Sequence, residues 1–262
     1  MHYVKHKRER FGKCNICLKE AKLTWDHVLP RSGIDLSAVE MQTVLQRFTT
    51  NNNKFLISQN GVKYRTICKS CNEFLGSTYD KVMNDFSRTL SKFLDSSLIL
   101  PKIINIKTKP NLLVKGIIAH LISAKSEIDE VTFDNKFREF ILNKNASIPK
   151  DLHIYYWIYP YNSIIVIRDF MMPSIRGKFK EFSFFHLLKF FPIAYLVSDS
   201  KAYENLPDLI KYCNSNCDFE TDIKINLERV ESYNWPEIVD DGNVFFGGKS
   251  FESSVITKPK VK

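Results

Sequence analysis

Two pairs of cysteines constrain this chain more than any other feature. Two residues separate Cys14 from Cys17, two separate Cys68 from Cys71, and fifty residues lie between the pairs. Two residues between cysteines allow one tight turn to direct both sulfur atoms at a single ion, and two such turns complete a tetrahedral zinc shell. The spacing therefore predicts that the fifty intervening residues begin and end at one site, where four thiolates bind a structural Zn²⁺.

Two disulfides, or unrelated buried thiols, are the alternatives for these four cysteines. The chain shows no stretch typical of a signal peptide. The most apolar segment, 182–197, contains charged residues and a proline, and it is shorter than the roughly 18–20 residues that a spanning helix needs. We therefore expect a cytoplasmic protein with no membrane part, in which thiols stay reduced. Cys213 and Cys217 have no second pair nearby, so we expect no metal or redox role for them.

The composition is that of a globular protein with a local excess of positive charge. Of the 262 residues, 44% are hydrophobic and 26% are charged, and the formal net charge is +9. The first 31 residues contain eight Lys or Arg against three acidic residues, which accounts for five of the nine net charges. The charge is therefore concentrated around the first cysteine pair, where it suits an anionic partner.

Apolar spacing predicts an α+β protein with two domains, residues 1–80 and residues 81–262. In the first, we expect a strand at 23–25, a helix at 36–48 and a hairpin that turns at Asn60-Gly61. In the second, helical periodicity predicts helices at 79–98, 112–123 and 133–142, and β-prone runs predict strands at 153–159, 163–170 and 187–197.

The second domain is thus expected to combine these helices with a small antiparallel sheet. The first two of its strands are expected to pair through a turn at Pro160, and the third to be an edge strand or a bulged strand because Pro192 interrupts it. The residues from about Phe251 onward are expected to form a flexible basic tail. The aromatic run Tyr155–Tyr159 is more typical of a sheet core than of a surface that stacks on bases.

Polar residues between and after the cysteine pairs follow a recognisable order. Asp26-His27 is followed by Pro30, Ser32 and Gly33, and Asn72 comes directly after the last cysteine. This order resembles the HNH endonucleases, in which Asp-His and a Pro-x-Ser segment lie between two C-x2-C pairs and Asn or His follows the second pair. The resemblance covers roughly residues 10–80 and implies an N-terminal ββα-metal nuclease module with a structural zinc.

The resemblance also implies a chemistry. His27 would be the general base, and Asp26 and Asn72 would bind a catalytic Mg²⁺ or Mn²⁺, which prefers oxygen ligands. The expected substrate is double-stranded DNA. As alternatives, His27 could be a structural histidine, Asp26 could cap a turn, and Asn72 could cap the following helix. Adjacent residues on a regular strand point to opposite faces, so Asp26 and His27 can share a site only at a twisted strand or a strand end.

Four basic residues near these positions are candidates for contacts with phosphate, although each could also be an ordinary solvated charge: Arg31, Lys63, Arg65 and Lys69.

Three roles are considered for the second domain, residues 81–262: recognition of DNA, sensing of a signal and binding of a partner. HNH proteins with an extra domain are associated with restriction, phage-defence and mobile-element systems. The alternatives to a nuclease are a non-catalytic, zinc-dependent DNA-binding module and a nuclease that a protein or ligand activates through residues 81–262.

Overall fold

The computed structural model describes residues 4–29, 38–49, 55–128, 132–173, 182–201, 203, 205–237 and 250–260. These residues form both helices and sheets, as expected for an α+β protein. The helical elements are α1 (Val44–Thr49), α2 (Lys69–Leu75), the π-helical turn η1 (Gly76–Asp80), α3 (Lys81–Leu94), α4 (Pro110–Ser123), α5 (Thr132–Leu142) and the 3-10 turn η2 (Leu209–Tyr212). The three helices predicted between 79 and 142 are confirmed as α3, α4 and α5.

Within the described ranges, the strands form three antiparallel sheets. The smallest contains β6 (Ile103–Thr108) and β11 (Thr221–Asn226), and a three-stranded sheet has the order β1 (Phe11–Lys13), β2 (Glu20–His27) and β5 (Lys63–Cys68). The large sheet has seven strands in the order β4 (Leu56–Ser58), β3 (Val39–Thr43), β12 (Val255–Pro259), β8 (Ile165–Pro173), β9 (Phe182–Phe190), β10 (Ile193–Ser198) and β7 (His153–Ile158). The predicted strand at 23–25 is confirmed within β2.

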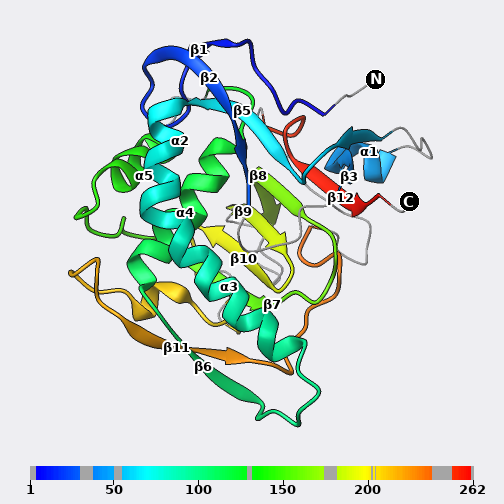
Figure 1. The fold of residues 1–262 in the computed structure, drawn as a ribbon, viewed down its shortest axis with the longest axis vertical. Helices are drawn as coiled ribbons and strands as arrows, with labels where there is room; N and C mark the ends of the chain where they lie inside the picture. Colours follow the sequence, from blue (N-terminus) through cyan, green and yellow to red (C-terminus); the bar gives the residue numbers. More distant parts are fainter. Residues whose placement is uncertain are drawn as a thin grey trace.

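One long helix links the three-stranded sheet to the rest of the molecule. α2, η1 and α3 follow one another without a break from Lys69 to Leu94, and Figure 1 shows this helix crossing in front of the large sheet. Behind it, α4 contacts α3, α5 and strands β8 and β9. All fourteen residues of α4 are buried, which agrees with its nearly uniform apolar composition.

The core occupies both faces of the large sheet. Tyr156 and Ile158 belong to one apolar cluster, which also contains Ile67, whereas Tyr155 and Trp157 belong to a second cluster. The alternation follows from the two-residue period of a strand. The aromatic run is therefore part of the sheet core, as its composition suggested, and these side chains are not exposed to bases.

The predicted hairpin at Asn60-Gly61 is wrong, although the turn itself forms. Asn60 and Gly61 have φ values of 62° and 78°, the left-handed conformation that these residues tolerate. The strands on either side diverge, however, because β4 pairs with β3 and β5 pairs with β2. The turn residues thus fix the local backbone, but they do not decide which strands pair.

Three further predictions need correction for the same reason. The expected helix at 36–48 contains β3 followed by the short helix α1. β8 pairs with β9 and β12, not with β7. The run at 187–197 is not an edge strand, because Pro192 lies between β9 and β10, and β10 pairs on both sides. The sheet is thus larger than predicted.

The predicted flexible tail is also wrong where the structure describes it. Val255, Ile256 and Thr257 are buried in β12, which lies between β3 and β8 near the middle of the large sheet. The prediction gave weight to the basic residues at the end of the chain and overlooked the short apolar segment that precedes them. Strands from 39–58 and from 153–259 therefore belong to one sheet, and the division into two domains at residue 80 stays a prediction about folding units.

Candidate functional site

The four cysteines predicted to bind zinc come together. Among the described residues, the Sγ atoms of Cys14, Cys17, Cys68 and Cys71 form a group in which all lie within 4.8 Å of one another. The Sγ atoms of Cys17 and Cys68 are 3.9 Å apart, close to the separation of about 3.8 Å in a ZnS₄ tetrahedron with Zn–S bonds of about 2.3 Å. All four cysteines are free, so the disulfide alternative does not hold here. The cluster can bind a metal such as zinc.

Backbone groups in the two turns support a thiolate in this cluster. The N–H of Cys68 donates a hydrogen bond of 3.3 Å to Sγ of Cys14, and Leu18 has a positive φ of 61°, which closes the first turn. Hydrogen bonding with the Cys71 thiol lowers the pKa of Cys14 to about 5; burial opposes this shift, and backbone N–H groups add to it. Burial raises the pKa of Cys17, and the hydrogen bond with Cys14 raises that of Cys71, so without a metal the thiolate is favoured at Cys14.

Asp26 and His27 form the last two residues of β2. Where β2 pairs with β5, the register shifts at Thr66 of β5, which lies opposite the step from Thr24 to Trp25. Trp25 is 39% exposed, whereas Asp26 and His27 are only 6% and 9% exposed. Both residues of the pair are therefore buried where β2 ends, as the sequence argument required of a shared site.

Asn72 is bonded to the same strand end. Its Nδ2 group donates hydrogen bonds to Oγ1 of Thr24 at 3.2 Å and to the carbonyl oxygen of Trp25 at 3.0 Å. Asn72 is not the helix cap, because α2 begins at Lys69 and Cys68 is its N-cap residue. Both bonds use the amino group of the side chain, so neither occupies the amide oxygen that a metal would require.

The carboxylate of Asp26 lies in an unusual environment. Burial raises the pKa of Asp26 to about 6; the charge of His120 opposes this shift, the carboxylate of Asp80 adds to it, and the hydroxyl of Ser123 opposes it. Its Oδ2 atom has no hydrogen-bond partner among the described residues. A buried carboxylate oxygen with no partner is costly, and it calls for an explanation in structure or function.

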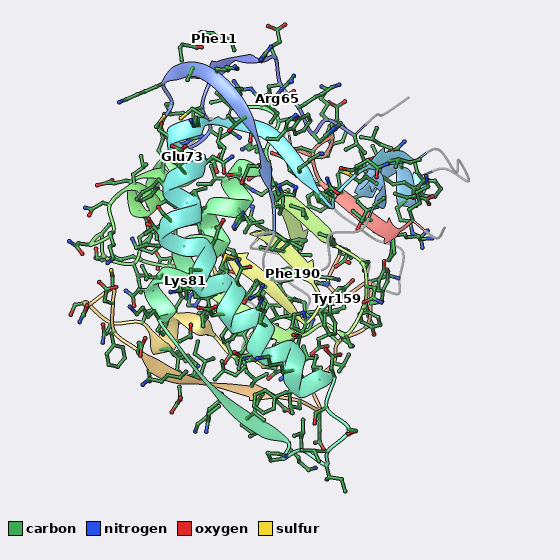
Figure 2. All side chains as sticks on the ribbon, in the orientation of Figure 1. Phe11, Arg65, Glu73, Lys81, Tyr159 and Phe190 are labelled. Atoms are coloured by element: carbon green, nitrogen blue, oxygen red, sulfur yellow. The ribbon has the colours of Figure 1, made fainter. Side chains whose placement is uncertain are left out.

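The predicted phosphate-binding residues do not form one group. Lys63 and Arg65 lie over the ring of Trp25, with Nζ and Cζ at 5.6 Å and 5.4 Å from the ring centroid. His6 stacks on the same ring at 5.5 Å. Figure 2 shows Arg65 on the strand that leads into α2, where Glu73 lies. We call His6, Trp25, Lys63 and Arg65 the outer patch.

The other two candidates lie apart from this patch. Lys69 is at the start of α2, and its Nζ is 3.5 Å from Oε1 of Glu73, both side chains being largely exposed. Arg31 lies outside the described residues. The sequence interpretation missed Trp25 and His6; the only available signal was the position of Trp25 directly before the Asp-His pair.

Sequence reasoning also missed two residues from the long helix and α4. Asp80 is the last residue of η1, and His120 lies within α4. The pKa of His120 is raised, because Asp80 and Asp26 outweigh the opposing effect of burial. No local pattern links positions 26, 80 and 120, so only the packing of α4 could identify this group.

Comparisons with models of protein families, with curated proteins and with solved structures found no match to this chain. Its function must therefore be inferred from its own residues. Within the described ranges, no helix is long and apolar enough to cross a membrane.

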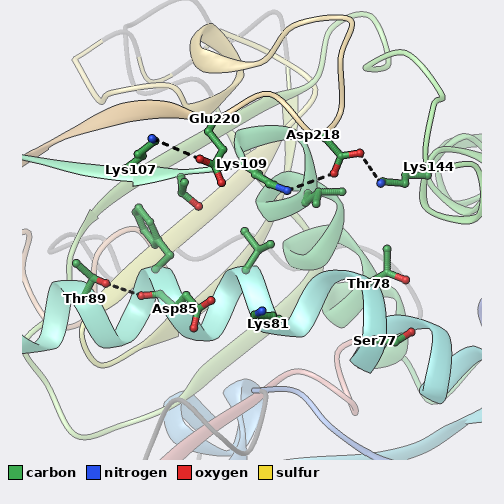
Figure 3. A pocket seen from close by; sticks show the side chains of 14 residues that line it. Ser77, Thr78, Lys81, Asp85, Thr89, Lys107, Lys109, Lys144, Asp218 and Glu220 are labelled. Carbon is green, nitrogen blue, oxygen red and sulfur yellow. Dashed lines mark hydrogen bonds and ion pairs between the residues drawn. The ribbon is translucent and has the colours of Figure 1, made fainter.

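Figure 3 shows a cavity of about 610 Å³ between α3 and the end of β6, which residues just before β11 also line. Its lysines are largely neutralised, since Lys107 pairs with Glu220 at 3.5 Å, and Lys109 and Lys144 pair with Asp218 at 3.4 Å and 2.6 Å. None of the predicted site residues lines it. We therefore place the candidate functional site at the end of β2, not in this cavity.

Proposed function

We propose that this protein is a metal-dependent endonuclease of the HNH type that hydrolyses phosphodiester bonds in double-stranded DNA. The observation that carries the proposal is the hydrogen bond of 3.0 Å between Asn72 and the Trp25 carbonyl. It joins the first turns of α2 to the strand end that bears Asp26 and His27. The cysteine cluster supports it further, because Cys68 and Cys71 flank the start of that helix.

The residues of the strand end fit a hard divalent cation. Asp26 offers a buried carboxylate oxygen with no partner among the described residues, and Asn72 offers its amide oxygen; oxygen donors of this kind suit Mg²⁺ and Mn²⁺. Such an ion would stabilise the negative charge that develops on the phosphate and on the leaving oxygen. His27 would accept a proton from the attacking water, and the four cysteines would bind a structural zinc.

The test is a plasmid cleavage assay with the full chain and several divalent ions. We expect nicking or cleavage with Mg²⁺ or Mn²⁺, and loss of activity by at least about 100-fold in His27→Ala. The zinc content of this variant should remain that of the parent protein, because His27 is not a cysteine ligand. Full activity of His27→Ala would remove the histidine from the proposed role.

A second candidate function is zinc-dependent DNA binding without catalysis. The observation that favours it is the burial of Asp26 and His27, whereas Trp25 between Lys63 and Arg65 remains 39% exposed. A binding module of this kind would retain salt-sensitive DNA binding in Asp26→Ala and His27→Ala. It would not cleave DNA, whichever divalent ion is added. Loss of DNA binding after Arg65→Ala, with no cleavage by the parent protein, would select this function.

A further inference from the structure

The two-stranded sheet of β6 and β11 has one strand edge that is covered and one that is open. On β11, the N–H of Lys224 donates a hydrogen bond of 3.4 Å to the hydroxyl of Tyr212, and its carbonyl accepts one of 2.8 Å from the hydroxyl of Tyr156. Side chains from η2 and β7 thus cover the middle of the β11 edge. β6 forms the other edge, and within the described ranges it pairs with no strand except β11.

These bonds identify the backbone groups of β6 that point away from β11. In an antiparallel pair, opposite residues alternate between pairs that exchange hydrogen bonds and pairs that exchange none. Lys224 lies opposite Asn105 and uses its backbone for the two tyrosines, so the N–H and C=O groups of Asn105 point outward. The bond of 2.8 Å from the N–H of Leu227 to the carbonyl of Lys102 agrees, because that pair lies three positions away.

The open edge therefore contains three residues that face outward. Residues two positions from Asn105 share its orientation, so the backbone groups of Ile103, Asn105 and Lys107 all point away from β11. Their side chains are exposed, whereas the alternate residues of β6 are buried. Prolines, bulges and unpaired charges commonly prevent further pairing at an edge strand. β6 has no proline and no register shift, and Lys107 is paired with Glu220 at 3.5 Å.

The neighbouring helix approaches β6 from its buried side. α3 contacts β6, and Phe86 and Leu90 of this helix belong to the same apolar cluster as Ile104 and Ile106. Figure 1 shows β6 at the lower margin of the molecule, with no labelled helix or strand beyond it. The edge is thus open to a further strand.

The order of residues along the edge favours a second copy of the same strand. Antiparallel pairing centred on Asn105 gives three opposite pairs that each exchange two backbone hydrogen bonds. In this register, Ile103 lies opposite Lys107 of the second copy. An in-register parallel pairing would instead bring the two Lys107 side chains together, which is destabilising.

The surroundings of the edge also suit a copy of this chain. Glu220 balances the charge of Lys107, and Glu228 lies 3.1 Å from Lys102, so the edge has no surplus charge to attract an acidic peptide or DNA. The leucine and isoleucine at positions 98 and 99, just before β6, are largely exposed. In the antiparallel register, this apolar segment of one copy approaches the end of β6 in the other, where the cavity of Figure 3 lies.

We propose that two copies of this chain associate through antiparallel pairing of their β6 strands. The pairing joins two ribbons, each marginal by itself, into one four-stranded sheet with the order β11-β6-β6-β11. Strands of six residues provide a small interface, so the association depends on protein concentration. This inference does not depend on the nuclease reaction.

Sedimentation equilibrium of the zinc-loaded full chain measures the association. We expect the mass to rise with concentration from 30.6 kDa toward twice this value. Asn105→Pro removes an N–H from the centre of the interface and no bond between β6 and β11, so the dissociation constant should rise by at least about tenfold. Asp222→Pro is the matched control, because Asp222 lies opposite Lys107 and its N–H points to the other edge. Zinc content and melting temperature serve as measures of folding.

Cross-linking of Asn105→Cys tests the register. The two copies of residue 105 lie directly opposite each other, with Cα atoms about 5.5 Å apart, which a disulfide can span. Oxidation with diamide should therefore give a covalent dimer on a non-reducing gel. Lys224→Cys is the control: it lies opposite Asn105 on the same exposed face, but three strand spacings, about 14 Å, separate its two copies.

The outcomes decide the proposal even if Asn105→Pro does not fold, because Asn105→Cys then provides the test. A parent protein that stays monomeric at every concentration would overturn the proposal and would leave the edge to a strand of another protein. Equal weakening in Asp222→Pro, or equal cross-linking in Lys224→Cys, would overturn it as well. A dimer that cleaves no DNA would contradict the nuclease and retain the pairing of β6.

Discussion

The side-chain amide of Asn15 donates a hydrogen bond of 3.0 Å to the backbone carbonyl of Ile122, and a second of 2.6 Å to the carbonyl of Lys125. Asn15 lies between the first two cysteines, whereas these carbonyls lie at the C-terminal end of α4, where the last carbonyls of a helix lack intrahelical partners. The first cysteine turn therefore caps the helix that carries His120. Metal binding at the cysteines and the position of α4 are thereby linked.

Replacement of this cap should affect both stability and metal retention. In Asn15→Ala, two buried carbonyl groups lose their donor, and we expect the free energy of unfolding to fall by about 2–3 kcal/mol. Zinc should also transfer faster to a colorimetric chelator. Asn226→Ala is the control, because that side chain bonds only locally to Glu228 at an exposed position. Equal rates of zinc loss in the two variants would contradict the link.

The two kinds of cysteine in this chain should respond differently to replacement. Cys17→Ser removes one of four sulfur ligands, so we expect less than one zinc per chain and a lower melting temperature. Cys213→Ser should retain the zinc content, since Cys213 is not among the four clustered cysteines. Metal analysis by mass spectrometry checks both variants. A loss of zinc in Cys213→Ser would mean that the ligand set is different.

Gly116 controls how closely α4 approaches the long helix. A Cβ atom at this position would lie 2.6 Å from Sδ of Met83 and 3.3 Å from Cβ of Tyr79. We expect Gly116→Ala to lower the free energy of unfolding by about 1–3 kcal/mol through overpacking. Denaturant unfolding provides the measurement.

Gly76→Ala is the matched control for this substitution. Gly76 has a helical φ of −57° and open space around it, so alanine there should stabilise the protein by about 0.4–1 kcal/mol. If Gly116→Ala were as stable as Gly76→Ala, the close packing of α4 against η1 and α3 would be wrong.

Acid should destabilise the protein partly through His186. Its Nδ1 accepts hydrogen bonds from the backbone N–H of Asp169 at 3.0 Å and from Nε of Arg168 at 3.2 Å. Burial lowers the pKa of His186 to about 3, and the charge of Arg168 contributes to the shift. In the unfolded chain the pKa of histidine is about 6.5. The unfolded state therefore binds a proton first, and the stability present above pH 6.5 is lost progressively as the pH falls toward 3.

The measurement is the free energy of unfolding in urea at pH 7, 6 and 5. The histidine contribution should approach about 1.4 kcal/mol per pH unit below pH 6.5. Most carboxylates contribute at lower pH, because their pKa values in the unfolded chain are about 4. Asp26 is an exception: its raised pKa of about 6 means that the folded state binds the proton first, which opposes the histidine contribution below pH 6. His186→Asn should show a smaller loss of stability between pH 7 and pH 5. An unchanged pH dependence in this variant would exclude His186 as the source.

The fragment 1–80 should not fold by itself. It contains β3 and β4, which pair in the large sheet, and it ends where the long helix continues into α3. Without these partners the apolar faces of both strands remain exposed, so we expect rapid proteolysis and no cooperative thermal transition. A sharp transition with zinc bound would support the division at residue 80, and cleavage by the fragment would favour regulation by the rest of the chain.

Local features of the sequence predicted much of the protein. The spacing within each cysteine pair predicted a cluster, because a two-residue separation fixes the geometry of one turn. The helices α3, α4 and α5 followed from apolar periodicity, which depends only on neighbouring turns. The buried aromatic run of β7 was also predicted correctly, because large aromatic side chains gain most from burial.

The pairing of strands was decided only by the tertiary structure. Asn60 and Gly61 adopt the backbone of a hairpin turn, yet β4 and β5 join different sheets. The apolar surface that each strand covers comes from residues far away in the chain, as β12 shows beside β3. The same holds for the candidate site: Asp26, His27 and Asn72 were proposed from their order in the chain, whereas the hydrogen bond between His120 and Asp80 exists only because α4 packs against η1. Sequence spacing sets local geometry, and packing between distant segments sets which polar groups share a buried space.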